Sequence, residues 1–278
     1  MRHVRADDIA TVFQDPVTFL NPVLTIGAQL KEAFLVQNEI PLIATADDQS
    51  SREAGDHNIK DYLLRRDLSG TEVRNIKTTE RRAGKLVDGL SKDMLKLVRL
   101  PDPERIMSQF PHQLSGGMRQ RCMIAMALAR RPSIIIADEI TTALDVTVQA
   151  QILSLLKELR DAIDASTLLI THDLSIAAET ADRIAVMYAG NVVEVATTKE
   201  MFKNPLHPYT QLLMKCIPDV RKPITRLESI HGTVPDLIDP PSGCRFHPRC
   251  PFVTDICRLE KPLLKDVGNN HSVHCHLY

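Results

Sequence analysis

Apolar positions recur along the chain with two spacings that predict different elements. Apolar residues three or four positions apart predict amphipathic helices, and short unbroken apolar runs that end at turns predict strands. Helical spacing extends over 26–36, 85–100, 116–129, 148–159 and 173–181. Strand-like runs cover 9–13, 133–137, 167–171, 183–189 and 192–196, the last two joined by the hairpin signal Gly190-Asn191. This alternation predicts an α/β layered fold with a largely parallel sheet, in which Pro101 and Pro103 stop the second helix.

Two adjacent carboxylates follow one of the apolar runs. We expect the strand Ile134–Ala137 to be buried on both faces and to deliver Asp138 and Glu139 at its C-terminal edge, where ligands bind in open α/β sheets. In P-loop NTPases such an Asp helps to hold magnesium at the β- and γ-phosphates. Any buried strand that ends in acids at a turn would give the same pattern, so the pattern is weak by itself.

A Ser and two glycines open the third predicted helix. Ser115, Gly116 and Gly117 would present backbone N–H groups and the positive end of the helix dipole to an anion. The glycines would allow a phosphate to approach the backbone closely. The alternative is an ordinary N-cap provided by Ser115.

Composition excludes several classes of protein. The 34 Lys and Arg residues balance 35 Asp and Glu, which leaves no global basic field for nucleic acid. Aromatic residues make up 4% and Trp is absent, which disfavours an all-β sandwich or a carbohydrate cleft. The longest apolar run is Cys122–Ala129, far shorter than the roughly 20 residues of a membrane span, and the first ten residues lack the apolar region of a secretory signal. We therefore expect a cytoplasmic protein.

The segment 43–85 differs in character, because 17 of its 43 residues are charged against 25% overall. Such a segment buries little surface, and we interpret it as a solvated, partly helical or mobile insertion. A surface for a partner is the alternative interpretation.

The two chemical patterns belong to a larger ordered set, and this set resembles the nucleotide-binding subunits of ABC transporters. The matching motifs are the Q-loop (Gln14), the signature (Leu114–Met118, with Met118 in place of the usual Gln), Walker B (Ile134–Asp138), the catalytic glutamate (Glu139), the D-loop (Ala143–Asp145) and the switch histidine (His172). Four further stretches are similar to the dipeptide/oligopeptide (and nickel) importer branch: Val12–Pro16, Ser115–Gln120, Met187–Gly190 and Asn204–Thr210. The resemblance covers nearly the whole chain except the insertion at about 43–85.

The resemblance implies an ATPase subunit that powers the import of peptides or nickel. It implies ATP and Mg²⁺ as ligands, with Asp138 holding magnesium, Glu139 acting as general base, His172 contacting the γ-phosphate and Gln14 sensing magnesium or water. Ser115, Gly116, Gly117 and Asp145 would contribute nucleotide contacts. The implied partners are transmembrane permease subunits, a second ATPase subunit in a heterodimer and, indirectly, an extracytoplasmic substrate-binding protein, with no nucleic acid. The implied location is the cytoplasmic face of the membrane.

Two departures from the family pattern qualify this expectation. Ile140 stands where the family usually has Pro. More important, the phosphate-binding loop G-x-x-x-x-G-K-[S/T] is absent, since the sole Gly-Lys pair, Gly84-Lys85, lacks both the first Gly and the hydroxyl residue. We therefore expect an incomplete P-loop NTPase that lacks its N-terminal part. The alternative function is a truncated, catalytically silent fragment that binds metal and partner subunits, and a nucleic-acid ATPase is disfavoured by charge.

The expected organisation has four parts. Residues 1–34 would carry the Q-loop, 35–112 a helical subdomain with the insertion, 113–200 the remaining ATPase core, and 201–278 a Pro-rich, oligopeptide-transporter-like extension.

The extension carries four cysteines separated by five, six and seventeen residues: Cys244, Cys250, Cys257 and Cys275. Four soft ligands in a segment with a thin core indicate a metal site, but this spacing does not separate zinc from iron–sulfur. The family resemblance implies a [4Fe-4S] cluster, His271, His274 and His276 beside Cys275 keep zinc open, and free thiols are the remaining alternative. Cys122 and Cys216 are interpreted as core residues.

Overall fold

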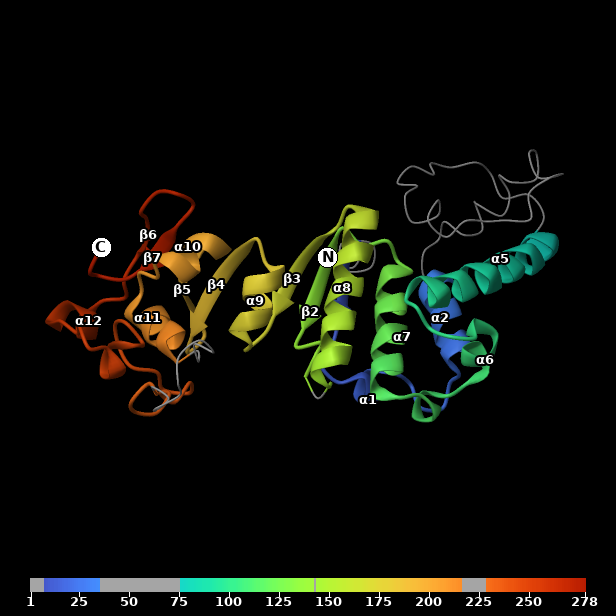
Figure 1. Cartoon of the computed structure of the whole chain (residues 1–278), viewed down its shortest axis with the longest axis horizontal. Coiled ribbons are helices and arrows are strands. Elements are labelled where there is room, and N and C mark those ends of the chain that lie inside the picture. Colours follow the sequence, from blue (N-terminus) through green and yellow to red (C-terminus); the bar gives the residue numbers. More distant parts are fainter. Residues whose placement is uncertain (1–7, 36–75, 143, 217–228) are drawn as a thin grey trace. The chain divides into compact units, whose positions relative to one another are not determined.

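The computed structural model describes residues 8–35, 76–142, 144–216 and 229–278, in two compact units, 1–172 and 173–278 (Figure 1). Residues 43–75 of the charged insertion and Ala143 of the D-loop lie outside the described residues. The four-part organisation expected from the sequence stays a prediction.

The first unit contains a three-stranded parallel sheet. Its strands are β1 (Ile9–Val12), β2 (Ile134–Asp138) and β3 (Ser166–Ile170), in the order β1-β2-β3. The register pairs Val12 with Ala137 and Asp138 with Ile170. The parallel pairing is therefore confirmed for this unit, and the carboxyl ends of all three strands meet at one edge.

One face of this sheet forms the core and the other does not. The inward side chains of β1 and β2, Ala10, Val12, Ile135 and Ala137, are buried. Ile134 is 39% exposed, and Leu168 and Ile170 of β3 are also exposed. The prediction that β2 is buried on both faces is wrong, because side chains alternate along a strand and only one set of them joins the core cluster.

Helices complete the first unit (Figure 1). They are α1 (Pro16–Phe19), α2 (Ile26–Leu35), α5 (Ile76–Leu97), α6 (Pro103–Ser108), the 3₁₀ turn η2 (Pro111–Gln113), α7 (Gly116–Leu128) and α8 (Val146–Ile163). α7 packs against β1, α8 and α2, and α2 also contacts α5 and α6. α5 begins inside the predicted insertion, so 76–85 is helical.

Pro103 has a different role from the one that we expected. α5 ends at Leu97, and Pro103 then occupies the first position of α6. A backbone N–H at this position has no partner within the helix, so its absence in proline costs nothing. Asp102 caps this helix by accepting a hydrogen bond from the Arg105 N–H. The proline thus starts a short helix as well as following one.

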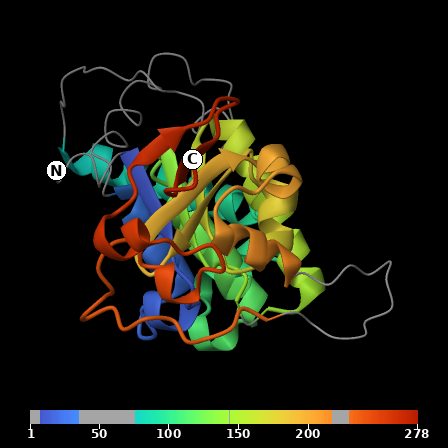
Figure 2. The ribbon, with the colours of Figure 1, turned by 90° about the vertical axis from the view of Figure 1, so that its left-hand side faces the viewer.

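The second unit is built on a four-stranded antiparallel sheet in the order β4-β5-β7-β6. Its elements are α9 (Leu174–Thr180), β4 (Arg183–Tyr188), β5 (Asn191–Thr197), α10 (Thr198–Lys203), α11 (Pro208–Lys215), η3 (His247–Arg249), α12 (Asp255–Leu259), β6 (Leu264–Asp266) and β7 (Ser272–His274). The β4–β5 hairpin is confirmed. β6 and β7 were not predicted, and Figure 2 shows them in red beside the gold strands.

A buried carboxylate ties this second sheet to the segment that leads into α11. Glu194 of β5 is fully buried and accepts hydrogen bonds from the N–H groups of Leu206 (2.8 Å) and His207 (2.9 Å). The buried His271 lies with Nε2 2.7 Å from Glu194 Oε1. Since a buried carboxylate is costly unless it is hydrogen-bonded, these three partners account for its position.

None of the helices within the described ranges has both the length and the apolar character needed to cross a bilayer.

Candidate functional site

Three polar side chains follow the three parallel strands and meet at one edge of the sheet. Gln14 comes after β1, Glu139 directly after β2 and His172 after β3. Gln14 Nε2 donates to Glu139 Oε2 at 2.6 Å, and His172 Nδ1 lies 3.2 Å from Glu139 Oε1. The sheet thus brings together three residues that the motifs singled out.

A fourth residue in this group was missed by the sequence analysis. The Thr142 hydroxyl donates to Glu139 Oε2 at 3.1 Å. His172 first and Thr142 second hold the pKa of the Glu139 carboxyl below its ordinary value, because both partners stabilise its ionised form. The available signal was a hydroxyl three residues after the glutamate, on the turn that follows β2.

The backbone of Glu139 is held in an uncommon conformation. Its φ is +45°, in the left-handed region that non-glycine residues rarely adopt. The Glu139 N–H donates to the Ile170 carbonyl at 3.0 Å, and Ile140 after it is buried in the core. These contacts fix the turn without the Pro that the family usually has, and they aim the carboxylate at Gln14 and His172.

Asp138 ends β2 beside this group. It is half-buried, and its Cα is in register with Ile170 of β3. Among the residues that the structure describes, no hydrogen bond or ion pair to the Asp138 carboxylate is found. A carboxylate in this position is available to a cation such as Mg²⁺, which prefers oxygen ligands.

The serine–diglycine segment starts α7, and here the N-cap interpretation is confirmed. Ser115 caps the helix and accepts from the Met118 N–H at 3.4 Å. A Cβ added at Gly117 would lie 2.9 Å from Val148 Cγ1 of α8. The glycine therefore permits close packing of the two helix starts.

Asp145 has a matching role at the start of α8. Its carboxylate accepts from the Val148 N–H at 2.9 Å. Asp145 is thus an N-cap in this structure, and a nucleotide contact from it stays a prediction.

The ordered motifs agree with a match to two family models. The model of the ABC transporter family matches residues 1–142, and that of the oligopeptide/dipeptide transporter C-terminal region matches residues 193–257. The chain is an ATP-binding protein of the ABC transporter family, in its dipeptide/oligopeptide branch.

Individual relatives resemble this ABC protein over almost its whole length. It is 43% identical over 275 residues to the dipeptide transport ATP-binding protein DppD of Haemophilus influenzae. The aligned residues make up 99% of this chain and 70% of that protein. It is 44% identical over 277 residues to DppD of Bacillus subtilis, and the aligned residues make up 100% of this chain and 70% of that protein. It is 42% identical over 275 residues to DppD of Escherichia coli, and the aligned residues make up 99% of this chain and 71% of that protein.

The cysteines of the C-terminal extension lie around one pocket of the second unit. Cys244, Cys250, Cys257 and Cys275 all line it, together with His207 and Phe246 among others. Burial raises the pKa of the Cys244, Cys250 and Cys275 thiols. In the part of this ABC protein that the structure describes, no three His, Cys, Asp or Glu side chains are arranged to hold a metal ion.

The other two cysteines differ from each other. Cys122 is fully buried on α7, and burial raises the pKa of its thiol to about 12, so it is a core residue as predicted. Cys216 caps the C-terminus of α11 and is only half-buried.

Proposed function

We propose that this chain is the ATP-hydrolysing subunit of an importer of dipeptides or oligopeptides, with nickel as the alternative cargo. The observation that carries the proposal is the contact of Gln14, Glu139 and His172 at the carboxyl edge of one parallel sheet. In open α/β sheets this edge is where ligands bind. The names of the DppD relatives, dipeptide transport ATP-binding proteins, agree with this cargo class.

The roles follow from the positions of the side chains. Asp138 would hold magnesium, which when bound would neutralise charge on the phosphates. Glu139 is kept ionised by its donors and would accept a proton from the attacking water. His172 would donate to the γ-phosphate, and Gln14 would orient water or magnesium once it releases Glu139. Catalysis would come mainly from positioning and electrostatics.

The 278 residues contain no G-x-x-x-x-G-K-[S/T] sequence, and the proposed hydrolysis requires a phosphate-binding loop beside Asp138 and Glu139. The alternative function, a catalytically silent chain that binds metal and partner subunits, follows if no such loop reaches Asp138 and Glu139. ATP hydrolysis by the transporter assembled with this chain separates the two, because the proposed hydrolysis depends on a loop that the isolated chain does not contain. Turnover that Glu139→Gln abolishes would rule out the silent chain, and turnover that does not change in Glu139→Gln would support it. Glu179→Gln, an exposed acid elsewhere, is the matched control.

An apolar patch beside the Q-loop supports a membrane partner. Phe13, Val17, Phe19 and Val23 are 44%, 59%, 45% and 75% exposed, and the Phe13 and Phe19 ring centroids lie 5.1 Å apart. Gathered apolar side chains on a surface mark interaction sites. We assign this Q-loop patch to a transmembrane permease subunit, which would place the chain at the cytoplasmic face of the membrane, with an extracytoplasmic substrate-binding protein as an indirect partner.

A second ATPase subunit would complete the nucleotide site. The start of α7 with Ser115, Gly116 and Gly117, and the start of α8 with Asp145, would face a nucleotide held by this companion chain in a heterodimer. Both helix starts carry backbone N–H groups that suit an anion.

The four-cysteine pocket supports a metal cofactor, a [4Fe-4S] cluster with zinc as the alternative. The donor set fits both, since thiolates are ligands of zinc and of iron–sulfur clusters. Burial raises the pKa of the Cys244, Cys250 and Cys275 thiols, so these three would have to lose their protons on loading. An anaerobic absorption spectrum with metal analysis tests this: a brown protein with four irons supports the cluster, a colourless protein with stoichiometric zinc supports zinc, and a metal-free protein refutes both.

A further inference from the structure

A second pocket of the C-terminal unit lies between the β4–β5 hairpin and two loops. It has a volume of about 180 Å³, whereas one water needs on the order of 10–15 Å³. The residues that line it include Arg245, Lys261, His274, Asn191 and Tyr188. The pocket therefore has room for a small molecule.

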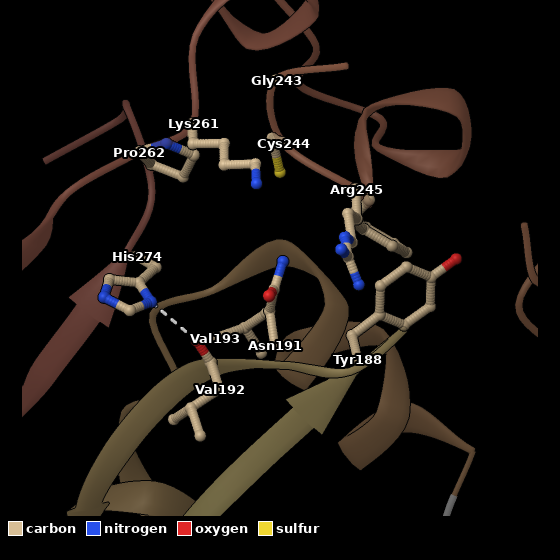
Figure 3. A pocket seen from close by; sticks show the side chains of 11 residues that line it. Tyr188, Asn191, Val192, Val193, Gly243, Cys244, Arg245, Lys261, Pro262 and His274 are labelled. Carbon is tan, nitrogen blue, oxygen red and sulfur yellow. Dashed lines mark hydrogen bonds between the residues drawn. The ribbon is translucent and has the colours of Figure 1, made fainter. Parts of the chain in front are cut away.

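The charged groups of this pocket are all of one sign. Arg245 and Lys261 carry positive charges, and no Asp or Glu is among the residues that line it. Figure 3 shows the Lys261 ammonium, the Arg245 guanidinium and the Asn191 amide pointing from three segments toward one space. Such convergence, without a compensating acid, favours an anion.

The two cations are held differently. The Arg245 guanidinium donates to the Ala189 carbonyl of the hairpin turn, while its Nε has no hydrogen-bond partner among the described residues. Lys261 has no ion pair or hydrogen bond within the described part of the chain. Arg245 is thus fixed in position, and Lys261 is free to reach a ligand.

The remaining lining restricts the class of ligand. His274 Nδ1 lies 2.6 Å from the Val192 carbonyl, so this nitrogen carries the proton, and the ring adds no negative charge. Val192, Val193, Phe246 and Pro262 give the pocket an apolar wall. An amino acid or peptide would leave its ammonium without a carboxylate partner, which is unfavourable beside two cations.

We propose that this pocket binds a small oxyanion without an ammonium group, a carboxylate or a phosphate, between Arg245 and Lys261. The site is independent of the sheet edge that carries Glu139 and of the proposed ATP hydrolysis.

Isothermal titration of the full chain in low-salt buffer tests the proposal with three probes: succinate, inorganic phosphate and alanyl-alanine. We expect saturable binding of succinate, phosphate or both, and none of alanyl-alanine. A stronger response to succinate identifies an organic carboxylate, and a stronger response to inorganic phosphate identifies a phosphate group. Absence of binding by both anions up to about 10 mM would overturn the proposal, as would equal binding of alanyl-alanine.

Lys261→Gln is the decisive variant, because Lys261 is exposed and we expect its replacement to leave the fold intact. We expect affinity to fall by about 10- to 100-fold, the value of a charge-assisted hydrogen bond, with recovery in Lys261→Arg. Lys199→Gln, an exposed lysine of α10 outside the pocket, should bind as the wild type does. Unchanged affinity in Lys261→Gln would overturn the assignment.

Discussion

Gln14 donates a 2.6 Å hydrogen bond to Glu139, although 125 positions separate the two residues in the sequence. The parallel pairing of β1 with β2 brings them together. Gln14 directly follows Phe13, whose exposed ring packs against the exposed ring of Phe19. A partner that displaces this segment would therefore also displace a hydrogen-bond donor of the glutamate.

Replacing His172 should change the titration of Glu139. The His172→Ala variant loses the largest contribution to the lowered pKa, so the pKa of the Glu139 carboxyl should rise toward its ordinary value. In the wild type the hydrogen-bonded carboxylate is fully ionised at any pH above the ordinary pKa of a glutamate, and it becomes protonated as the pH falls through the lowered pKa. NMR titration of labelled glutamate carboxyls measures the shift, with Glu179 as internal control. An unchanged pKa of Glu139 would refute the electrostatic role of His172.

A charge in the Q-loop patch should weaken assembly with the permease. Phe19→Glu places a carboxylate where we expect an apolar contact, and burying it should lower affinity at least about tenfold. Co-purification with membrane subunits measures the effect. Leu259→Glu, at an exposed apolar position of the second unit, is the control. Equal recovery of both variants would argue against docking at this patch.

The two glycines of the signature segment should respond differently to alanine. A Cβ at Gly117 meets Val148 Cγ1 at 2.9 Å, whereas one at Gly116 meets only Leu144 Cδ2 at 3.7 Å. Gly117→Ala should lower the free energy of unfolding by about 1–3 kcal/mol, while Gly116→Ala should be near neutral. Urea denaturation checks both. Val148→Ala should reduce the cost of the Gly117 change, and additive effects of the two substitutions would contradict the steric explanation.

The buried Glu194 should matter for the stability of the second unit. In Glu194→Gln the amide N–H₂ group faces one of the three hydrogen-bond donors around this side chain, where the carboxylate accepted. We expect the free energy of unfolding to fall by about 2–4 kcal/mol. Tyrosine emission during urea unfolding is a suitable signal, because Tyr188, Tyr209 and Tyr278 lie in this unit. The exposed Glu179→Gln should change stability by less than about 0.5 kcal/mol. Similar small losses in both variants would show that the Glu194 contacts contribute little.

The parallel sheet and the meeting of its strand-end residues were predictable. Each of the three strands is a short apolar run that ends in a polar motif residue, and parallel strands place such residues at one edge. The start of α7 was predictable for a similar local reason, since the capping residue Ser115 precedes an apolar helical pattern. The apolar positions from Val148 onward predicted α8, which begins slightly earlier, at Val146.

The antiparallel sheet of the second unit was not predictable from local patterns. β7 has only three residues and pairs with the distant strand β5. His271, just before β7, lies against Glu194 of β5, and 77 positions separate these two residues. Neither the short strands nor the buried Glu194 gives a periodic signal, because their stability depends on contacts between distant segments. The exposed face of β2 was missed for a related reason: a run of three isoleucines shows apolar character but not which neighbours cover it.

The most direct test of the account is MgATP hydrolysis by the assembled transporter that contains Glu139→Gln. We expect turnover to fall at least about a hundredfold while nucleotide binding persists, because the amide cannot accept the proton of the attacking water. Glu179→Gln should hydrolyse ATP at the wild-type rate. Wild-type turnover by Glu139→Gln would contradict the assignment of the Gln14–Glu139–His172 group as the hydrolytic centre.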